Sequence, residues 1–65
     1  MNADELVAAG VTALKQGNRA EAKKLLAQAV RVAPRDSAGW LWLSGALDSR
    51  DEQRYCLEKV LQLDP

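Results

Sequence analysis

Residues 22–34 read AKKLLAQAVRVAP and residues 53–65 read QRYCLEKVLQLDP. The two segments align at an offset of 31 residues, and both end in proline. Within each segment, apolar residues recur at three- and four-residue intervals, the spacing of one face of an α-helix. The aligned apolar pairs are Leu26 with Leu57, Ala29 with Val60, Val30 with Leu61 and Val32 with Leu63. A repeat of this length predicts helical hairpins that stack on one another.

Start and stop signals divide the chain into four helices, which we expect at about 3–16, 19–33, 37–48 and 50–63. Capping-box spacing opens three of them, at Asn2 with Glu5, Asn18 with Glu21 and Ser49 with Glu52, and Asp36 or Ser37 can cap the other. Gly17 is placed to end the first helix, and Pro34 and Pro65 stop the second and the fourth. The short connections force neighbouring helices to run antiparallel.

The composition agrees with an all-α fold. The chain is rich in Ala and Leu and has no Ile or Phe, so strand-forming residues are scarce. Nine basic residues balance nine acidic ones, which gives no general reason to expect nucleic acid or a membrane as partner. There is no signal peptide and no apolar run of the roughly 20 residues that span a bilayer, so we expect a cytoplasmic protein.

The repeated residues support a family assignment. In residues 3–36 they are Leu6, Gly10, Gly17, Ala22, Leu26, Ala29 and Pro34, and in residues 37–65 they are Trp40, Leu43, Leu57, Val60 and Pro65. This pattern resembles the tetratricopeptide repeat, whose unit has about 34 residues. The second unit departs from it: its turn is three residues shorter, and Gln53 replaces the small residue at Ala22. The resemblance implies one domain of two antiparallel hairpins, stacked as a short right-handed solenoid.

The resemblance also implies a binding surface. In that family the first helix of each hairpin lines a concave groove, which corresponds here to Val7, Val11, Leu14, Leu41, Trp42 and Gly45. Trp40 is then the core residue, and Trp42 either is left partly exposed as a contact residue or packs against the first hairpin. A known sub-class grips a peptide carboxylate with Lys and Asn, but Val7, Val11 and Trp42 stand at the matching positions. An apolar groove suits an apolar peptide, an amphipathic helix or another copy of the same surface.

Residues for catalysis or metal binding are lacking. The chain has no histidine, and Cys56 is its only cysteine, so we interpret Cys56 as a buried structural residue. The adjacent carboxylates Asp4 and Glu5, and Asp51 and Glu52, fall in first helical turns, where capping and the helix dipole explain them. We therefore expect neither an enzyme nor a cofactor.

The expected function is binding of a partner protein or peptide through the apolar groove. One alternative is an assembly domain that forms homodimers or belongs to a longer protein, because repeat arrays need about three units for stability. The last helix would then present Cys56, Val60 and Leu63 without a helix to cover all of them. A further alternative is RNA binding by the basic segment 15–35, which has six basic residues and one acid, although a solvated outer face explains that segment more simply.

Overall fold

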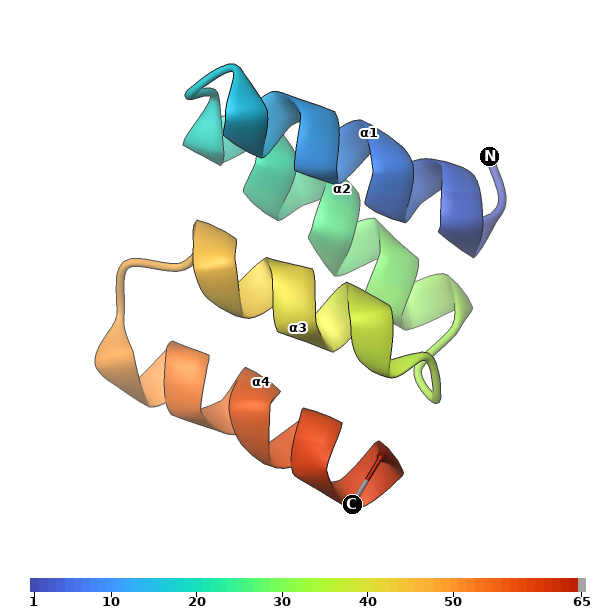
Figure 1. Cartoon of the computed structure of the whole chain (residues 1–65), viewed down its shortest axis with the longest axis vertical. Coiled ribbons are helices and arrows are strands. Elements are labelled where there is room, and N and C mark those ends of the chain that lie inside the picture. Colours follow the sequence, from blue (N-terminus) through green and yellow to red (C-terminus); the bar gives the residue numbers. More distant parts are fainter. Residues whose placement is uncertain (65) are drawn as a thin grey trace.

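The computed structural model describes residues 1–64, which form four α-helices (Figure 1). They are α1 (Ala3–Lys15), α2 (Arg19–Val32), α3 (Ser37–Ala46) and α4 (Arg50–Leu63). The all-α prediction is confirmed, and each helix lies within two residues of its expected bounds. The expected stop at Pro65 lies outside the described residues. No helix within residues 1–64 is both long and apolar enough to cross a membrane.

Each helix begins at the polar residue that the sequence indicated. At α1 the capping box is complete: the Glu5 N–H donates to Asn2 Oδ1 at 2.8 Å, and the Asn2 N–H donates to Glu5 Oε1 at 3.2 Å. Asn18, Asp36 and Ser49 cap the three other helices by accepting a backbone N–H of the first turn. Of the two candidates for α3, Asp36 is the cap, with its Oδ1 3.1 Å from the Ala38 nitrogen. These bonds satisfy N–H groups that a helix leaves unpaired at its start.

The helix ends differ between the two hairpins. Gly17 closes α1 at φ +79°, a left-handed conformation that favours glycine, and its N–H and that of Asn18 bond back to the Leu14 and Ala13 carbonyls. In contrast, α3 ends at Ala46, two residues before the expected position, because Leu47 is extended (ψ 145°). This extended backbone lets the Leu47 side chain stay buried in the core while the chain turns toward α4.

The helices pack as two hairpins, α1 with α2 and α3 with α4. The hairpins are joined where α3 packs on α2 and also touches α1, so α4 lies at the outer edge and packs on α3 (Figure 1). The buried cluster at the centre draws on all four helices and consists of Ala13, Ala22, Leu26, Val30, Leu43, Ala46, Leu47 and Cys56.

Small residues set the two closest helix approaches. A Cβ placed on Gly10 would lie 2.6 Å from Leu26 Cγ, so α1 fits over the fully buried Leu26 because it has a glycine there. A Cβ on Gly39 would lie 3.2 Å from Val30 Cγ1 and 3.8 Å from Ala29 Cβ, which brings α3 close to α2. Gly10 thus lets α1 approach α2, and Gly39 lets α3 approach Ala29 and Val30.

Candidate protein-binding face

The α1/α3 face consists of Val7, Val11, Leu14, Leu41, Trp42 and Gly45, the residues expected to line a groove. Val7, Val11 and Leu14 recur at helical spacing along one stripe of α1, and all three are partly buried. Val7 and Leu14 also pack against the central cluster. The helix that carries this stripe, α1, is in contact with α3.

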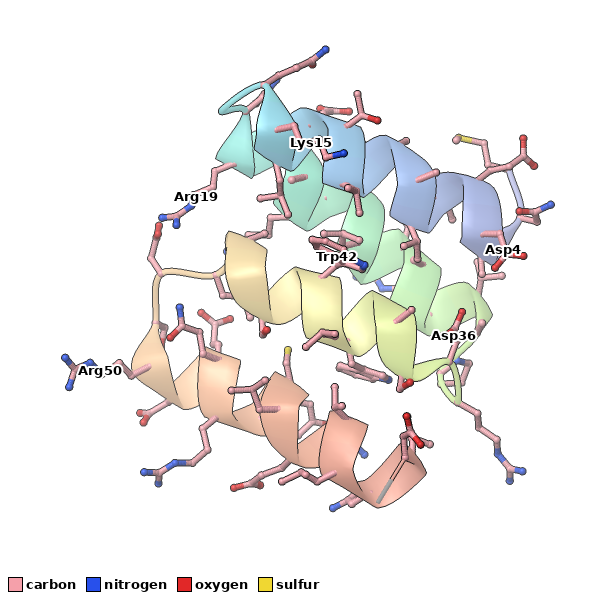
Figure 2. All side chains as sticks on the ribbon, viewed as in Figure 1. Asp4, Lys15, Arg19, Asp36, Trp42 and Arg50 are labelled. Atoms are coloured by element: carbon pink, nitrogen blue, oxygen red, sulfur yellow. The ribbon has the colours of Figure 1, made fainter. Side chains whose placement is uncertain are left out.

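The α3 residues of this face are the exposed part. Leu41 is 50% exposed and Trp42 is 41% exposed, although both are large and apolar. Figure 2 shows the Trp42 ring projecting from α3 toward the side of the molecule where α1 lies. Leu41 and Gly45, four residues apart, lie on the side of α3 opposite the buried Leu43, and nothing approaches within 4 Å of the space a Cβ on Gly45 would fill.

Trp40 and Trp42 have different environments. Trp40 is partly buried against the core, and its Nε1 donates to the Pro34 carbonyl at 2.8 Å. Its ring meets Tyr55 edge-on at 5.8 Å between centroids, and Lys59 Nζ lies 6.0 Å from its centre. Trp40 is thus held between the turn after α2 and the surface of α4. Trp40 packs against the core, as the resemblance implied, and Trp42 takes the more exposed of the two places left open for it, since a helix cannot direct both residues inward.

Charged residues flank the α1/α3 face at its ends. In Figure 2, Asp4 and Asp36 lie near the N-terminal ends of α1 and α3, whereas Lys15 lies at the opposite end of α1. Asp36 is engaged as the α3 cap, but Asp4 and Lys15 are exposed and carry no such bond in residues 1–64. A ligand lying along the face would therefore meet opposite charges at its two ends.

A cleft that the sequence did not indicate lies between α2 and α4. Its volume is about 260 Å³, and it is lined by Lys23 and Ala27 of α2, Trp40, Leu43 and Leu47 of α3, and Glu52, Tyr55 and Cys56 of α4. The cleft exists because α2 and α4 do not pack directly on each other within residues 1–64. No local pattern in the sequence indicated this cleft, because it depends on how far apart α2 and α4 lie.

Cys56 is buried, as the sequence predicted, with 3% of its surface exposed. Burial, and secondarily the negative charge of Glu52, raises the pKa of the Cys56 thiol above its ordinary value. The neutral thiol therefore predominates at neutral pH, and it is a poor nucleophile. Among residues 1–64, no three His, Cys, Asp or Glu side chains gather where they could hold a metal ion.

The structure shows which residues of α4 are covered. Of Cys56, Val60 and Leu63, which we expected no helix to cover completely, Cys56 faces the core, and Val60 and Leu63 are partly buried. The uncovered apolar residues are Leu57 and Leu61, with Tyr55 on another side. The exposure of Leu57 and Leu61 was not expected, because the sequence does not show which stripe of α4 meets α3.

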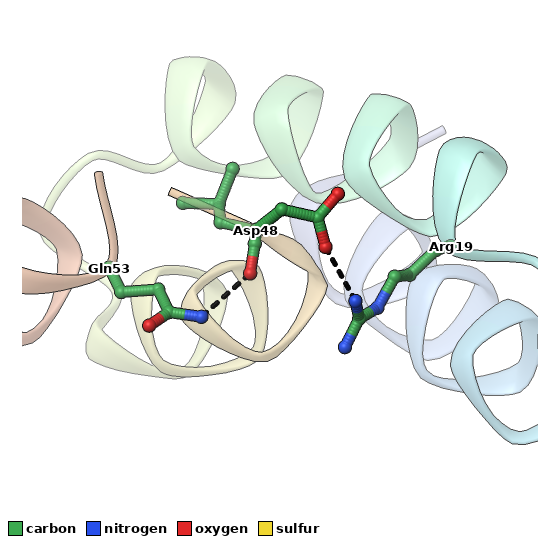
Figure 3. A network of polar contacts seen from close by, with 4 residues as sticks. Arg19, Asp48 and Gln53 are labelled. Atoms are coloured by element: carbon green, nitrogen blue, oxygen red, sulfur yellow. Dashed lines mark hydrogen bonds and ion pairs between the residues drawn. The ribbon is translucent and has the colours of Figure 1, made fainter. Parts of the chain in front are cut away.

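The basic residues of α2 lie on its outer surface. Lys23, Lys24 and Arg31 are exposed around a shallow hollow of about 440 Å³. Arg19, at the start of α2, instead pairs with Asp48 in the connection between α3 and α4 (Figure 3). This ion pair links the two hairpins, but both side chains are largely exposed, so it contributes little to stability.

The chain matches no protein-family model, no curated protein and no solved structure.

Proposed function

We propose that the chain is a non-catalytic interaction module of the tetratricopeptide type, which binds a peptide or helix of a partner protein on the α1/α3 face. The two hairpins would form a short right-handed solenoid. Support for this arrangement comes from the offset between the hairpins, from Gly10 against Leu26, and from the packing of α3 on α2.

One observation carries the proposed function: Leu41 and Trp42 are exposed side by side on a helix whose other large apolar residues are buried or partly buried. Burying such side chains against a partner removes apolar surface from water, and Trp is among the residues that most often dominate binding energy. Val7, Val11 and Leu14 extend this apolar surface onto α1. Isolated exposed leucines are ordinary, but an exposed leucine beside an exposed tryptophan favours binding.

The flanking charges favour one orientation of the bound segment. A segment with a basic residue near Asp4 and an acidic residue near Lys15 would place opposite charges together at both ends. Exposed pairs of this kind add little affinity, but they select the direction in which a ligand binds.

Selection from a displayed peptide library, followed by titration with the selected peptide, tests the proposal. Trp42→Ala should weaken binding by about 2 kcal/mol, roughly a 30-fold rise in Kd, with helix content unchanged. Leu41→Ala should also weaken binding, whereas its matched control, Leu61→Ala on the far surface of α4, should not. Equal binding by wild type and both α3 variants would exclude this face.

A further inference from the structure

The outer stripe of α4 is the largest difference between the two hairpins. Leu57 occupies the repeat position of Leu26, and Leu61 that of Val30. Leu26 is 0% exposed and Val30 is 9% exposed, whereas Leu57 is 45% exposed and Leu61 is 66% exposed. In the first hairpin, α3 lies against Val30, with its backbone brought close at Gly39. Leu26 is covered by α1 at Gly10 and Val30 by α3 at Gly39, whereas α4 packs on α3 alone within residues 1–64, so Leu61 lacks the antiparallel helix that covers Val30 (Figure 1).

Charges continue this stripe beyond the two leucines. Arg50, Arg54, Leu57, Leu61 and Asp64 follow one another at intervals of three or four residues, so they share one side of α4. Arg50 precedes Leu57 by seven residues and Asp64 follows it by seven, which places each roughly 10 Å from it along the axis. The stripe is thus basic at its start, apolar in the middle and acidic at its end.

Both end charges oppose the helix dipole. A helix start favours negative charge and a helix end favours positive charge. Arg50 is the first residue of α4 and Asp64 is its C-terminal cap, and α4 has no basic residue in its last turn. Within residues 1–64 the structure pairs neither Arg50 nor Asp64 with an opposite charge. A residue of opposite charge beside Arg50 or Asp64 would therefore be stabilising.

We propose that α4 packs against α4 of a second copy of the chain, antiparallel, about a two-fold axis near Leu57. The symmetry places Arg50 of each copy beside Asp64 of the other, because the two residues are equally far from the axis. Leu57 of one copy then meets Leu57 of the other at the axis, and Leu61 of each copy lies about 6 Å from the axis, near Arg54 of the other copy. A parallel arrangement would place Arg50 against Arg50 and Asp64 against Asp64, so the charges select the antiparallel one.

This interface is separate from the α1/α3 face, and the inference does not rest on the proposed function. The antiparallel packing of the two α4 helices also matches the packing of α3 on α2, which run antiparallel to each other. At the N-terminal edge, Glu5, which stands 34 residues before Gly39, is charged and occupied in the α1 capping box. Pairing through α4 therefore closes as a dimer rather than extending head to tail.

Sedimentation equilibrium of the full chain from micromolar to millimolar concentration provides the first test. Wild type should shift from monomer to dimer and should not form larger species. Leu57→Asp, which places two carboxylates together at the axis, should remain monomeric over this range, whereas Leu41→Asp, at a similarly exposed leucine on α3, should dimerise like wild type. A wild-type monomer at every concentration, or dimers that survive Leu57→Asp, would overturn the proposal.

Charge reversal tests the antiparallel arrangement. Arg50→Asp alone and Asp64→Arg alone should each raise the dimer dissociation constant by roughly tenfold, because each creates two like-charge contacts per dimer. Mixing the two variants should restore dimerisation as heterodimers, in which both contacts are again of opposite sign. Each variant should meanwhile raise the thermal midpoint of the monomer, because it improves the match with the helix dipole. Failure of the mixture to dimerise better than either variant would refute this geometry.

Discussion

The first hairpin and the second are built on the same sequence pattern, but their surroundings differ. In the first, α2 lies between α1 and α3, and its repeat residues Ala22, Leu26 and Ala29 are almost fully buried. In the second, α4 packs on α3 alone, and Leu57 is nearly half exposed although it aligns with Leu26. This difference indicates that the repeat pattern specifies a hairpin, whereas the neighbouring helix determines how much each repeat residue contributes to stability.

The largest expected effect compares Leu26 with its counterpart Leu57. Leu26→Ala should lower the free energy of unfolding by about 3 kcal/mol or more, because it removes a fully buried side chain and leaves a cavity beneath Gly10. A domain this small has about that much stability in total, so the cooperative transition should be lost. Leu57→Ala should cost less than about 1 kcal/mol. Urea unfolding, at concentrations where the chain is monomeric, measures both.

Similar costs for the two leucine variants would contradict the comparison, because they would mean that the outer side of α4 is covered within a single chain.

Two glycines inside helices should respond in opposite ways to alanine. Gly10→Ala should destabilise the chain by about 1–3 kcal/mol, because the new Cβ would overlap the Leu26 side chain. Gly45→Ala should stabilise it by about 0.5–1 kcal/mol, since the space beside Gly45 is open and alanine is the better helix former. Thermal unfolding of the two variants is a direct measurement. A stabilising Gly10→Ala would show that α1 does not approach α2 as closely as the structure has it.

The shortened turn depends on Gln53, which stands at the repeat position of Ala22 (Figure 3). Its Nε2 donates to the Leu47 carbonyl at 2.7 Å, in the connection that replaces the glycine turn of the first hairpin. Gln53→Met keeps the shape and removes this donor, so we expect a loss of about 1 kcal/mol in unfolding free energy. Gln62→Met, on the exposed part of α4, is the matched control and should change stability by less. An equal effect at both positions would assign no stabilising role to the Gln53 amide.

The smallest expected effect is a pH dependence due to Cys56. Its pKa is raised in the folded chain, so the folded state holds the thiol proton more tightly than the unfolded state does. The resulting stability is fully present below the unfolded pKa of about 9.0 and is lost as pH rises through the folded pKa. Stability should therefore fall more steeply above pH 9 in wild type than in Cys56→Ala. If the free energy of unfolding of the two proteins had the same pH dependence, the raised pKa of Cys56 would be contradicted.

Local signals predicted most of the fold. Asn2, Asn18, Asp36 and Ser49 cap the helices because each offers an oxygen acceptor immediately before a helical apolar pattern. Gly17 ends α1 because a left-handed residue was needed in so short a turn. The early end of α3 escaped prediction, because burial of Leu47 from an extended backbone depends on where α4 packs.

The candidate site was predictable to a smaller extent. The separation of Trp40 from Trp42 followed from helical geometry, since residues two apart cannot share a face. Helical geometry did not predict which side of α4 is buried, because apolar residues occupy two adjacent stripes of this helix. The packing of α3 shows that the stripe with Cys56 is covered and that Leu57 is not. The cleft between α2 and α4 depends on the distance between helices that are far apart in sequence, which no local pattern encodes.

Native-state hydrogen exchange, at a concentration where the chain is monomeric, tests the central claim that the neighbouring helix rather than the repeat pattern decides stability. Amides in the middle of α2 should exchange only through global unfolding, whereas those in the middle of α4 should open at a clearly lower free energy. Equal protection of α2 and α4 under these conditions would contradict the account.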